Sequence, residues 1–369
     1  MLLHPARPWD LRPTDEDGPP APEPAAWPPV AALVPARNEA GLLPQTLPAL
    51  LAQDYPGEWR VVLIDDRSRD GTAAVARRVG AGAAGLHVER GADLPEGWAG
   101  KVWALEQARR AAAGEPEPRW LLLTYADILH APGSLRALVA EAEAGRLDLV
   151  SRMARLRCTS RAERLLIPAF VLFFFLLYPM RWVNRPGRVA AAAGGCILVR
   201  AEALGRAGGF AAIRGALIDD LALARLVKEG GGAVRLALSR GAVASLRPYE
   251  DVGAVWRMVR RSAFTQLRRS WPLLVAVTVA MALLFLAPLV CVAAAVAGAA
   301  AGADGWPLPL AAGAAAWAVM AAVASPAGRA FGLGGRWGLA LPPAGALYIA
   351  MTVDSALRGP GQRAPYWRS

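Results

Sequence analysis

Acidic and basic side chains follow the apolar runs in the first half of the chain, at the point where each run ends. The run Trp120–Thr124 is too short for a helix and right for a buried strand, and Asp127 follows it. A carboxylate at the C-terminal edge of a parallel strand faces the crevice where α/β sheets bind ligands. Its hard oxygen donors suit a divalent metal that holds a phosphate. The same residues also fit a strand ending in a turn, with Asp127 as a helix cap.

Polar residues are placed in the same way after two earlier runs. Arg37 and Glu39 follow the first apolar run, and Asp65 and Asp66 close the second. Because the carboxyl ends of parallel strands meet at one edge of a sheet, we expect these side chains to converge on the acid described above. A pair of turns with capping acids is the alternative.

The elements that must position these residues alternate regularly. The sequence predicts strands at Pro29–Val34, Trp59–Ile64, Leu86–Glu89 and Trp120–Thr124, and helices at Ala40–Ala52, Ala73–Val79, Val102–Ala113 and Pro132–Ala144. Strand and helix at this spacing predict βαβ units on a mostly parallel sheet. The chain has no P-loop, and its one Gly-x-Gly-x-x-Gly, Gly80–Gly85, follows a predicted helix instead of a strand, which argues against dinucleotide and ATP chemistry.

Two further polar positions could take part in chemistry. Lys101 is one of only two lysines in an arginine-rich chain, and its compact charge suits a pyrophosphate; a solvated loop lysine is the alternative. Asp219 and Asp220 begin a predicted helix, where the helix dipole favours acids, so capping is the alternative to a catalytic role.

Composition excludes some classes of protein. The 369 residues carry a formal net charge of +11, but no zinc spacing, RNA-binding signature or basic repeat accompanies it, so nucleic acid is not an expected partner. The three cysteines are far apart and predict neither a disulfide framework nor a metal site. Residues 1–29 are Pro-rich without an apolar core, which predicts a disordered tail rather than a signal peptide.

The C-terminal third predicts membrane helices. Leu273–Ala303 and Gly305–Gly328 contain no charged residue, and Trp337–Val353 is a shorter uncharged run whose crossing is left open. Arginines before the first run and after the second place those ends in the cytoplasm.

The apolar run Leu165–Met180 predicts an interfacial or re-entrant helix. As a helix its 16 residues reach only about 24 Å, short of a hydrocarbon core of about 30 Å. A single crossing would also separate Asp127 from Asp220 across the membrane. A buried core helix is the alternative.

A series of motifs in order makes the chain resemble a known family. They are Pro35-Ala-Arg-Asn-Glu39, Ile64-Asp-Asp-Arg-Ser-Arg-Asp-Gly-Thr72, Gly97-Trp-Ala-Gly-Lys-Val-Trp103, Thr124-Tyr-Ala-Asp127, Gly194-Gly-Cys196, Gly208-Gly-Phe210 and Ile218-Asp-Asp-Leu221. These resemble the inverting family 2 glycosyltransferases, which have a GT-A fold and use nucleotide sugars. Within that family the chain looks most like the hopene-associated glycosyltransferases of bacterial hopanoid gene sets, relatives of the ceramide glucosyltransferases.

The resemblance implies an organisation for the whole chain. We expect an α/β GT-A domain with a Rossmann-like, mostly parallel sheet at residues 30–271, which includes the helix at 165–180. Transmembrane helices at 272–357 and a C-terminal tail at 358–369 would follow. The implied enzyme is a multi-pass protein of the bacterial inner membrane with its catalytic domain in the cytoplasm. It would pass a sugar from a nucleotide sugar, expected to be a UDP-sugar, to a hopanoid-like or sphingolipid-like hydroxyl with inversion.

The resemblance also implies roles for individual residues. Asp220 would be the general base with Asp219 in support, and Asp127 would hold Mg²⁺ or Mn²⁺. A membrane-proximal group of residues would brace the leaving diphosphate, although a basic helix on anionic headgroups fits it equally well: Gln266, Arg268, Arg269 and Trp271. The donor-binding residues would be Pro35, Arg37, Glu39, Asp65, Asp66, Lys101 and Tyr125.

One position departs from the family pattern. Tyr125 stands where the family usually has the first acid of Asp-Ala-Asp. A phenol cannot replace the charge of a carboxylate, although its ring could pack on the nucleotide. Two alternatives therefore stay open: a polyprenyl-phosphate sugar transferase, whose anionic acceptor needs no base, and a catalytically impaired lipid-binding relative.

Overall fold

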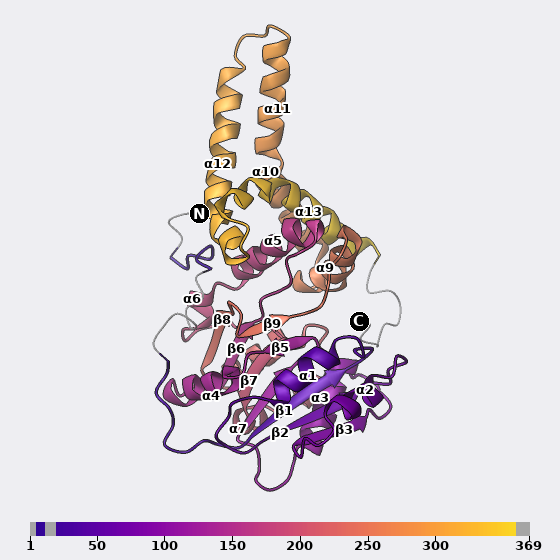
Figure 1. Cartoon of the computed structure of the whole chain (residues 1–369). Coiled ribbons are helices and arrows are strands. Elements are labelled where there is room, and N and C mark those ends of the chain that lie inside the picture. Colours follow the sequence, from indigo (N-terminus) through magenta and orange to yellow (C-terminus); the bar gives the residue numbers. More distant parts are fainter. Residues whose placement is uncertain (1–4, 12–19, 359–369) are drawn as a thin grey trace. The chain divides into compact units, whose positions relative to one another are not determined.

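The computed structural model describes residues 5–11 and 20–358. Residues 1–4 and 12–19 of the predicted N-terminal tail, and 359–369 of the predicted C-terminal tail, lie outside the described residues. The described chain divides into two compact units (Figure 1). The sheet unit comprises residues 20–157 and 178–247, and the helical unit comprises 5–11, 158–177 and 248–358.

The sheet unit is built on a seven-stranded sheet with the strand order β3-β2-β1-β4-β7-β6-β8. Its strands are β1 (Val30–Ala36), β2 (Trp59–Asp65), β3 (Leu86–Arg90), β4 (Trp120–Thr124), β6 (Leu149–Met153), β7 (Cys196–Arg200) and β8 (Val234–Leu238). Every residue of β1 and β4 is buried, as expected for parallel strands covered on both faces. The outer strand β3 is half-exposed along its length.

β1 lies inside the sheet, between β2 and β4, and pairs in parallel with both. Val30 is opposite Trp59 of β2 and opposite Trp120 of β4. The chain runs outward from β1 through β2 to β3, and then returns to β4 on the other side of β1. This reversal is the kind of switch point at which α/β sheets form a crevice at the carboxyl ends of their strands. The prediction of a mostly parallel α/β sheet is confirmed.

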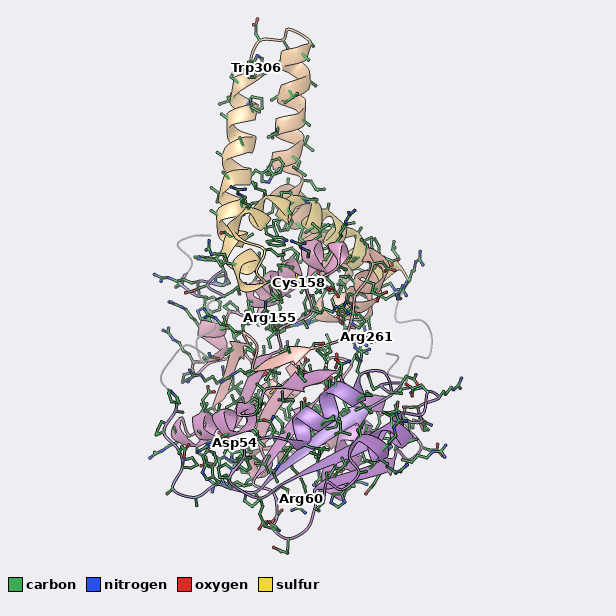
Figure 2. All side chains as sticks on the ribbon, in the orientation of Figure 1. Asp54, Arg60, Arg155, Cys158, Arg261 and Trp306 are labelled. Atoms are coloured by element: carbon green, nitrogen blue, oxygen red, sulfur yellow. The ribbon has the colours of Figure 1, made fainter. Side chains whose placement is uncertain are left out.

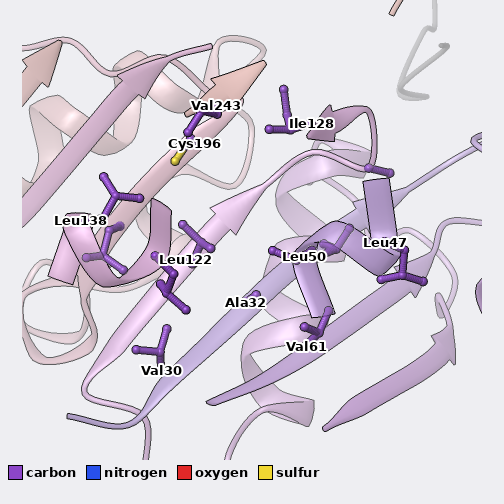
Figure 3. Close-up of a cluster of buried hydrophobic side chains, with 14 of the residues drawn as sticks. Val30, Ala32, Leu47, Leu50, Val61, Leu122, Ile128, Leu138, Cys196 and Val243 are labelled. Carbon is purple, nitrogen blue, oxygen red and sulfur yellow. The ribbon is translucent and has the colours of Figure 1, made fainter. Parts of the chain in front are cut away.

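β7 is a strand that the alternating pattern did not predict. It pairs antiparallel with both β4 and β6, with Thr124 opposite Cys196. As a consequence, the residues that enter β7 lie at the same edge of the sheet as the residues that leave β4. Figure 3 shows the apolar core around these strands, including Ala32, Val61 and Leu122 from the sheet and Leu47 from a covering helix.

Helices follow most of the strands. They are α1 (Leu43–Leu51), α2 (Thr72–Val79), α3 (Gly100–Ala111), α4 (Ser134–Ala144), α6 (Met180–Val183), α7 (Ala201–Arg206), the 3-10 helix η1 (Phe210–Ile213) and α8 (Asp219–Glu229). The apolar faces of α1 and α4 are buried against the sheet. α8 buries Leu221, Leu223, Ala224 and Val227, and thereby fixes the acids in its first turn relative to the sheet.

A second, two-stranded sheet lies beyond the carboxyl end of β4. β5 (Ile128–His130) pairs antiparallel with β9 (Val243–Ser245), with Ile128 opposite Ser245. The imidazole of His130 is buried, with Nε2 2.8 Å from Thr124 Oγ1 and Nδ1 3.2 Å from Ser134 Oγ. His130 therefore ties β5 to the end of β4 and to the start of α4.

Residues 20–29 contact the sheet unit, whereas the sequence predicts a disordered tail through residue 29. The Trp27 ring lies edge-on to Tyr55, with centroids 5.4 Å apart. The Tyr55 hydroxyl donates to the carbonyl of Pro28, and the guanidinium of Arg136 lies 5.5 Å from the Trp27 ring centroid. Burial of these aromatic surfaces offsets the entropy lost in ordering a Pro-rich segment.

The helical unit contains α5 (Arg161–Leu177), α9 (Val252–Gln266), α10 (Trp271–Phe285), α11 (Ala287–Ala300), α12 (Pro307–Ala330), the 3-10 helix η2 (Gly335–Ala340) and α13 (Leu341–Leu357). α11 and α12 run side by side as a hairpin with Trp306 at its turn (Figures 1 and 2). Phe173 of α5 packs against Phe285 and Tyr348, which joins α5 to α10 and α13.

Within the described residues, two helical segments are long and apolar enough to cross a membrane, and a bent pair could add a third. The two are Arg161–Val183 and Pro307–Ala330, and the pair is α10 with α11, bent by 43°. The first has 23 residues, whereas the predicted apolar run had 16. The segment is interrupted between α5, which ends at Leu177, and α6, which begins at Met180, and the 17 residues of α5 reach only about 26 Å. Its interfacial placement stays a prediction.

Burial lowers the pKa of His130 from its ordinary value of 6.5 to about 4. In the unfolded chain the imidazole of His130 is therefore protonated below pH 6.5, whereas in the folded chain it is protonated only below about pH 4. We expect the stability to be complete above pH 6.5 and to fall by up to about 3 kcal/mol as the pH drops toward 4. Thermal unfolding at pH 7.5 and 5.0 measures this loss. His130→Asn should reduce the pH dependence, and an equal dependence in both proteins would contradict the assignment.

Candidate functional site

The loops after β1 and β2 are bonded to each other at the carboxyl edge of the sheet. The N–H of Asn38 donates to Ser68 Oγ at 2.9 Å, and the N–H of Arg69 donates back to Asn38 Oδ1 at 3.0 Å. Asn38 and Arg67 both have a positive φ, of 54° and 55°. Such left-handed conformations are costly outside glycine, and asparagine tolerates them best. The two loops thus form one rigid rim, followed by α1 and α2.

Arg37, Asp65 and Asp66 line this rim, as the sequence predicts. Arg37 Nη1 donates to Asp66 Oδ2 at 3.1 Å, and Asp65 Oδ1 accepts the N–H of Ser68 at 2.9 Å. Burial raises the pKa of Asp66, and the guanidinium groups of Arg37 and Arg67 partly oppose that rise. Pro35, the remaining predicted residue of this group, lies within β1 opposite Ile64.

Arg247 joins two further acids of the edge. Its Nε donates to Asp127 Oδ2 at 3.2 Å, and its Nη2 donates to Glu39 Oε1. Asp127 Oδ2 also accepts the hydroxyl of Ser245 at 2.9 Å. Burial raises the pKa of Glu39 to about 7, with Asp127 contributing and Arg247 opposing. The loops after β1, β4 and β9 therefore meet at one guanidinium.

Lys101 joins the next pair of predicted residues. Its ammonium lies 2.7 Å from one carboxylate oxygen of Asp219 and 2.8 Å from the other. It also donates to the hydroxyl of Tyr125 and lies 3.9 Å from the centroid of that ring. α3, the end of β4 and α8 are thus brought together by one cation.

Asp220 is the most enclosed acid of α8. Its Oδ2 accepts the N–H of Gly194 at 2.9 Å, and its Oδ1 accepts the N–H of Leu221 at 2.8 Å. Burial raises the pKa of Asp220 to about 6, helped by the charge of Asp219 and opposed by Lys101. A carboxylate with a pKa near neutrality can take up a proton during a reaction and release it afterwards.

Gly194 is required where Tyr125 and Asp220 meet. A Cβ at this position would lie 1.7 Å from the hydroxyl oxygen of Tyr125 and 3.1 Å from Asp220 Oδ2. The first distance requires the tyrosine ring to move, and the second requires the Asp220 carboxylate to shift by a few tenths of an ångström. The motif Gly194-Gly-Cys196 therefore has a packing reason: it lets β7 begin directly beside the residues that leave β4.

The donor set at Asp127 does not fit a divalent ion while Arg247 stays in place. Among the described residues, no group of three or more His, Cys, Asp or Glu side chains is arranged to hold a metal ion. Asp127 and Glu39 share one guanidinium, that of Arg247. A divalent cation would have to displace or oppose that charge.

The four predicted membrane-proximal residues belong to the helical unit. Gln266 is the last residue of α9, Arg268 and Arg269 are exposed with φ of 54°, and the half-exposed Trp271 begins α10 and packs on Phe264. Asp354 of α13 anchors α9 by accepting the indole N–H of Trp256 at 2.7 Å. Their role at a leaving group stays a prediction.

Sequence reasoning missed Arg247 and Ser245. Ser245 ends the three-residue strand β9 and Arg247 follows it, and so short a strand carries no periodic signal. Both side chains donate to Asp127, about 120 positions earlier in the chain. Pairing of β5 with β9 brings them there, since the N–H of Leu246 donates to the carbonyl of Asp127 at 2.9 Å. Only knowledge of that pairing could have identified them.

Comparison with known proteins identifies related sequences and folds. Residues 31–208 match the family model described as glycosyl transferase family 2. No curated protein sequence matches the chain significantly. A mannosyltransferase from Pyrobaculum calidifontis, PcManGT, solved with GDP-Man and Mn²⁺, aligns over 95% of this chain and 92% of its own at 22% identity, with a TM-score of 0.53. At that identity the likeness shows the fold.

Two further solved structures align over a smaller share of this chain. TarS from S. aureus covers 64% of this chain and 39% of its own, at 16% identity and a TM-score of 0.42. Glucosyl-3-phosphoglycerate synthase from Mycobacterium tuberculosis, solved with Mn²⁺ and UDP-glucose, covers 63% of this chain and 79% of its own, at 19% identity and a TM-score of 0.39.

Adding one methyl group at Gly194 should disrupt the contact between Tyr125 and Asp220. We expect Gly194→Ala to lower the free energy of unfolding by about 1–3 kcal/mol, as overpacking does elsewhere. Gly205→Ala in α7 is the matched control, because a Cβ there meets nothing within 4 Å. Adding Tyr125→Ser to Gly194→Ala should restore stability by removing the ring. Urea denaturation measures all three, and a Gly194→Ala protein as stable as the control would refute the clash.

Proposed function

We propose that this chain, which carries a family 2 glycosyltransferase domain of the GT-A fold, transfers a sugar from a nucleotide sugar to the hydroxyl of a lipid. The observation that carries the proposal is the arrangement at the carboxyl edge of the sheet. There a half-buried acid, Asp220, lies beside the Lys101–Asp219 pair, and the acids after β1, β2 and β4 gather at the same edge.

The donor would occupy the crevice at the carboxyl ends of β1, β2 and β4. The rim formed by Arg37, Asp65 and Asp66 suits the nucleoside, because a carboxylate can accept the N–H of a uracil ring. We propose a UDP-sugar on this ground. Lys101 would face the diphosphate, since its ammonium is held at the same edge by Asp219 and Tyr125.

The reaction would proceed by direct displacement with inversion. Asp220 takes the proton from the acceptor hydroxyl as that oxygen forms its bond to the anomeric carbon. The bond from the anomeric carbon to the diphosphate oxygen breaks at the same time, and the nucleoside diphosphate leaves with the electron pair. The N–H groups of Gly194 and Leu221 hold the carboxylate of Asp220 in one orientation, which a general base requires.

The acceptor class is inferred from the helical unit. It contains apolar helices with exposed side chains such as Val275, Leu283 and Leu308, which are favourable in lipid and costly in water. A hopanoid-like or sphingolipid-like alcohol would fit such surroundings. Arg257, Arg261, Arg268 and Arg269 are exposed on and after α9, which favours a cytoplasmic side under the positive-inside rule, at the inner membrane of a bacterial cell.

A divalent ion at Asp127 remains the prediction from sequence. The printed descriptions of the Pyrobaculum and Mycobacterium proteins include Mn²⁺. Such an ion would offset charge on the leaving diphosphate. The contacts of Asp127 in this chain favour a different source of positive charge, and the steps above do not depend on an ion.

Asp220→Asn should remove the base while leaving the packing of α8 unchanged. We expect turnover with purified membrane lipids and radiolabelled UDP-sugars to fall by about 10²–10⁴, with nucleotide binding nearly intact. Glu229→Gln, an exposed change at the other end of α8, is the control and should be neutral. Unchanged turnover in Asp220→Asn would favour the polyprenyl-phosphate reaction, whose acceptor needs no base.

The pH dependence of turnover should report the same group. Since the pKa of Asp220 is raised to about 6, the base is ionised above that pH and protonated below it. We expect kcat/KM to be level above about pH 7 and to fall about tenfold per pH unit below pH 6. The residual rate of Asp220→Asn should lack this limb. If kcat/KM of the variant fell below the same pH as that of the wild type, the titration would belong to another residue.

A further inference from the structure

Arg247 lies at the carboxyl edge of the sheet, between two of its acids. Its guanidinium lies between Asp127, which follows β4, and Glu39, which follows β1. β1 and β4 are the two strands at which the chain order reverses, so this is the point where a ligand of an α/β sheet binds. The Arg247 side chain is 27% exposed, while the side chains of Glu39 and Asp127 are 2% and 7% exposed. A solute that enters the crevice therefore meets the cation before it meets the acids.

The contacts of Arg247 show that the cation is fixed rather than mobile. β5 and β9 are paired, and the N–H of Leu246 donates to the carbonyl of Asp127, so the residue after Leu246 is held at this place by the backbone. The two carboxylates then set the direction of the guanidinium. A guanidinium held in one orientation suits the oxygens of a phosphate, to which it can donate two parallel hydrogen bonds.

The same residues are poorly arranged for a divalent ion. Tyr125 stands where the resembling family has an acid, and its hydroxyl accepts from Lys101. The oxygen Oδ2 of Asp127 already accepts from Ser245 and Arg247. A metal ion bound to Asp127 would lie next to the guanidinium and be repelled by it.

We infer that Arg247 supplies, as a permanent part of the chain, the positive charge for the donor diphosphate that a divalent ion was predicted to supply at Asp127. Donor binding is then independent of metal. Glu39 and Asp127 serve to hold the guanidinium, and Lys101 contributes a second positive charge at the same edge. This inference rests on the proposed function, because it assumes a nucleotide-sugar donor.

Calorimetric binding of UDP and of GDP to the full chain in detergent tests the inference. Titrations are made in EDTA and in MnCl₂, and free Mn²⁺ is measured separately by its electron paramagnetic resonance signal. We expect the wild-type protein to bind one of the two nucleotides with less than twofold difference between the two conditions. We also expect it to leave the free Mn²⁺ signal unchanged when no nucleotide is present.

Arg247→Gln should reverse that behaviour. We expect binding in EDTA to weaken at least tenfold, MnCl₂ to restore part of it, and the variant to take up Mn²⁺, because both carboxylates are released. Arg247→Lys should keep part of the binding, since it keeps the charge but loses the forked geometry. It also decides the matter if Arg247→Gln fails to fold, as judged by circular dichroism.

The matched control is Arg155→Gln. Arg155, labelled in Figure 2, bridges to Ala244 of β9 but directs its guanidinium to the carbonyl of Arg240 at 3.1 Å. The Arg155→Gln protein should bind nucleotide as the wild type does, both in EDTA and in MnCl₂. The inference would be overturned if wild-type binding required Mn²⁺, or if Arg247→Gln and Arg247→Lys left metal-free binding unchanged. Either result would leave the proposed function standing. Failure of both nucleotides in both conditions would overturn the proposed donor as well.

Discussion

Four carboxylates lie almost out of water at one edge of the sheet: Glu39, Asp65, Asp66 and Asp127, each 8% exposed or less. A buried charge is tolerated only where a cation or a hydrogen-bond donor is within reach, and removing one partner costs more than the pair contributes. Arg37, Arg247 and the N–H of Ser68 are those partners. The loops, and therefore the shape of the crevice, follow from the requirement that each of these charges be matched.

Lys101 is the cation that matches a further carboxylate at this edge, that of Asp219. It comes from α3, yet its partners come from β4 and α8, so the ion pair joins elements far apart in sequence. Both oxygens of Asp219 contact Lys101, whereas Asp220, one residue further along the helix, accepts from the backbone N–H groups of Gly194 and Leu221. Two adjacent acids thus receive different surroundings, and burial leaves the second with the higher affinity for a proton.

The sequence predicted β1 to β4 well because these four strands alternate with helices at the spacing of βαβ units. β4 was predicted with its observed bounds, and β1 and β2 to within two residues. The later strands β5 to β9 were missed, since strands of three to five residues give no alternation that stands out locally. Residues that depend on those strands were missed with them. Arg247 is the clearest case, because its partners lie more than a hundred positions away.

The space at Gly194 links two positions that are 69 residues apart in sequence. The tyrosine ring at 125 occupies the volume that any side chain at 194 would need. An aspartate at 125 is shorter and would leave that volume empty, so larger residues at 194 become acceptable only after the ring has gone. Once such a residue is present, a tyrosine cannot return without a clash. Changes at the two positions would therefore accumulate in a fixed order along a lineage, and the second step would prevent reversal of the first.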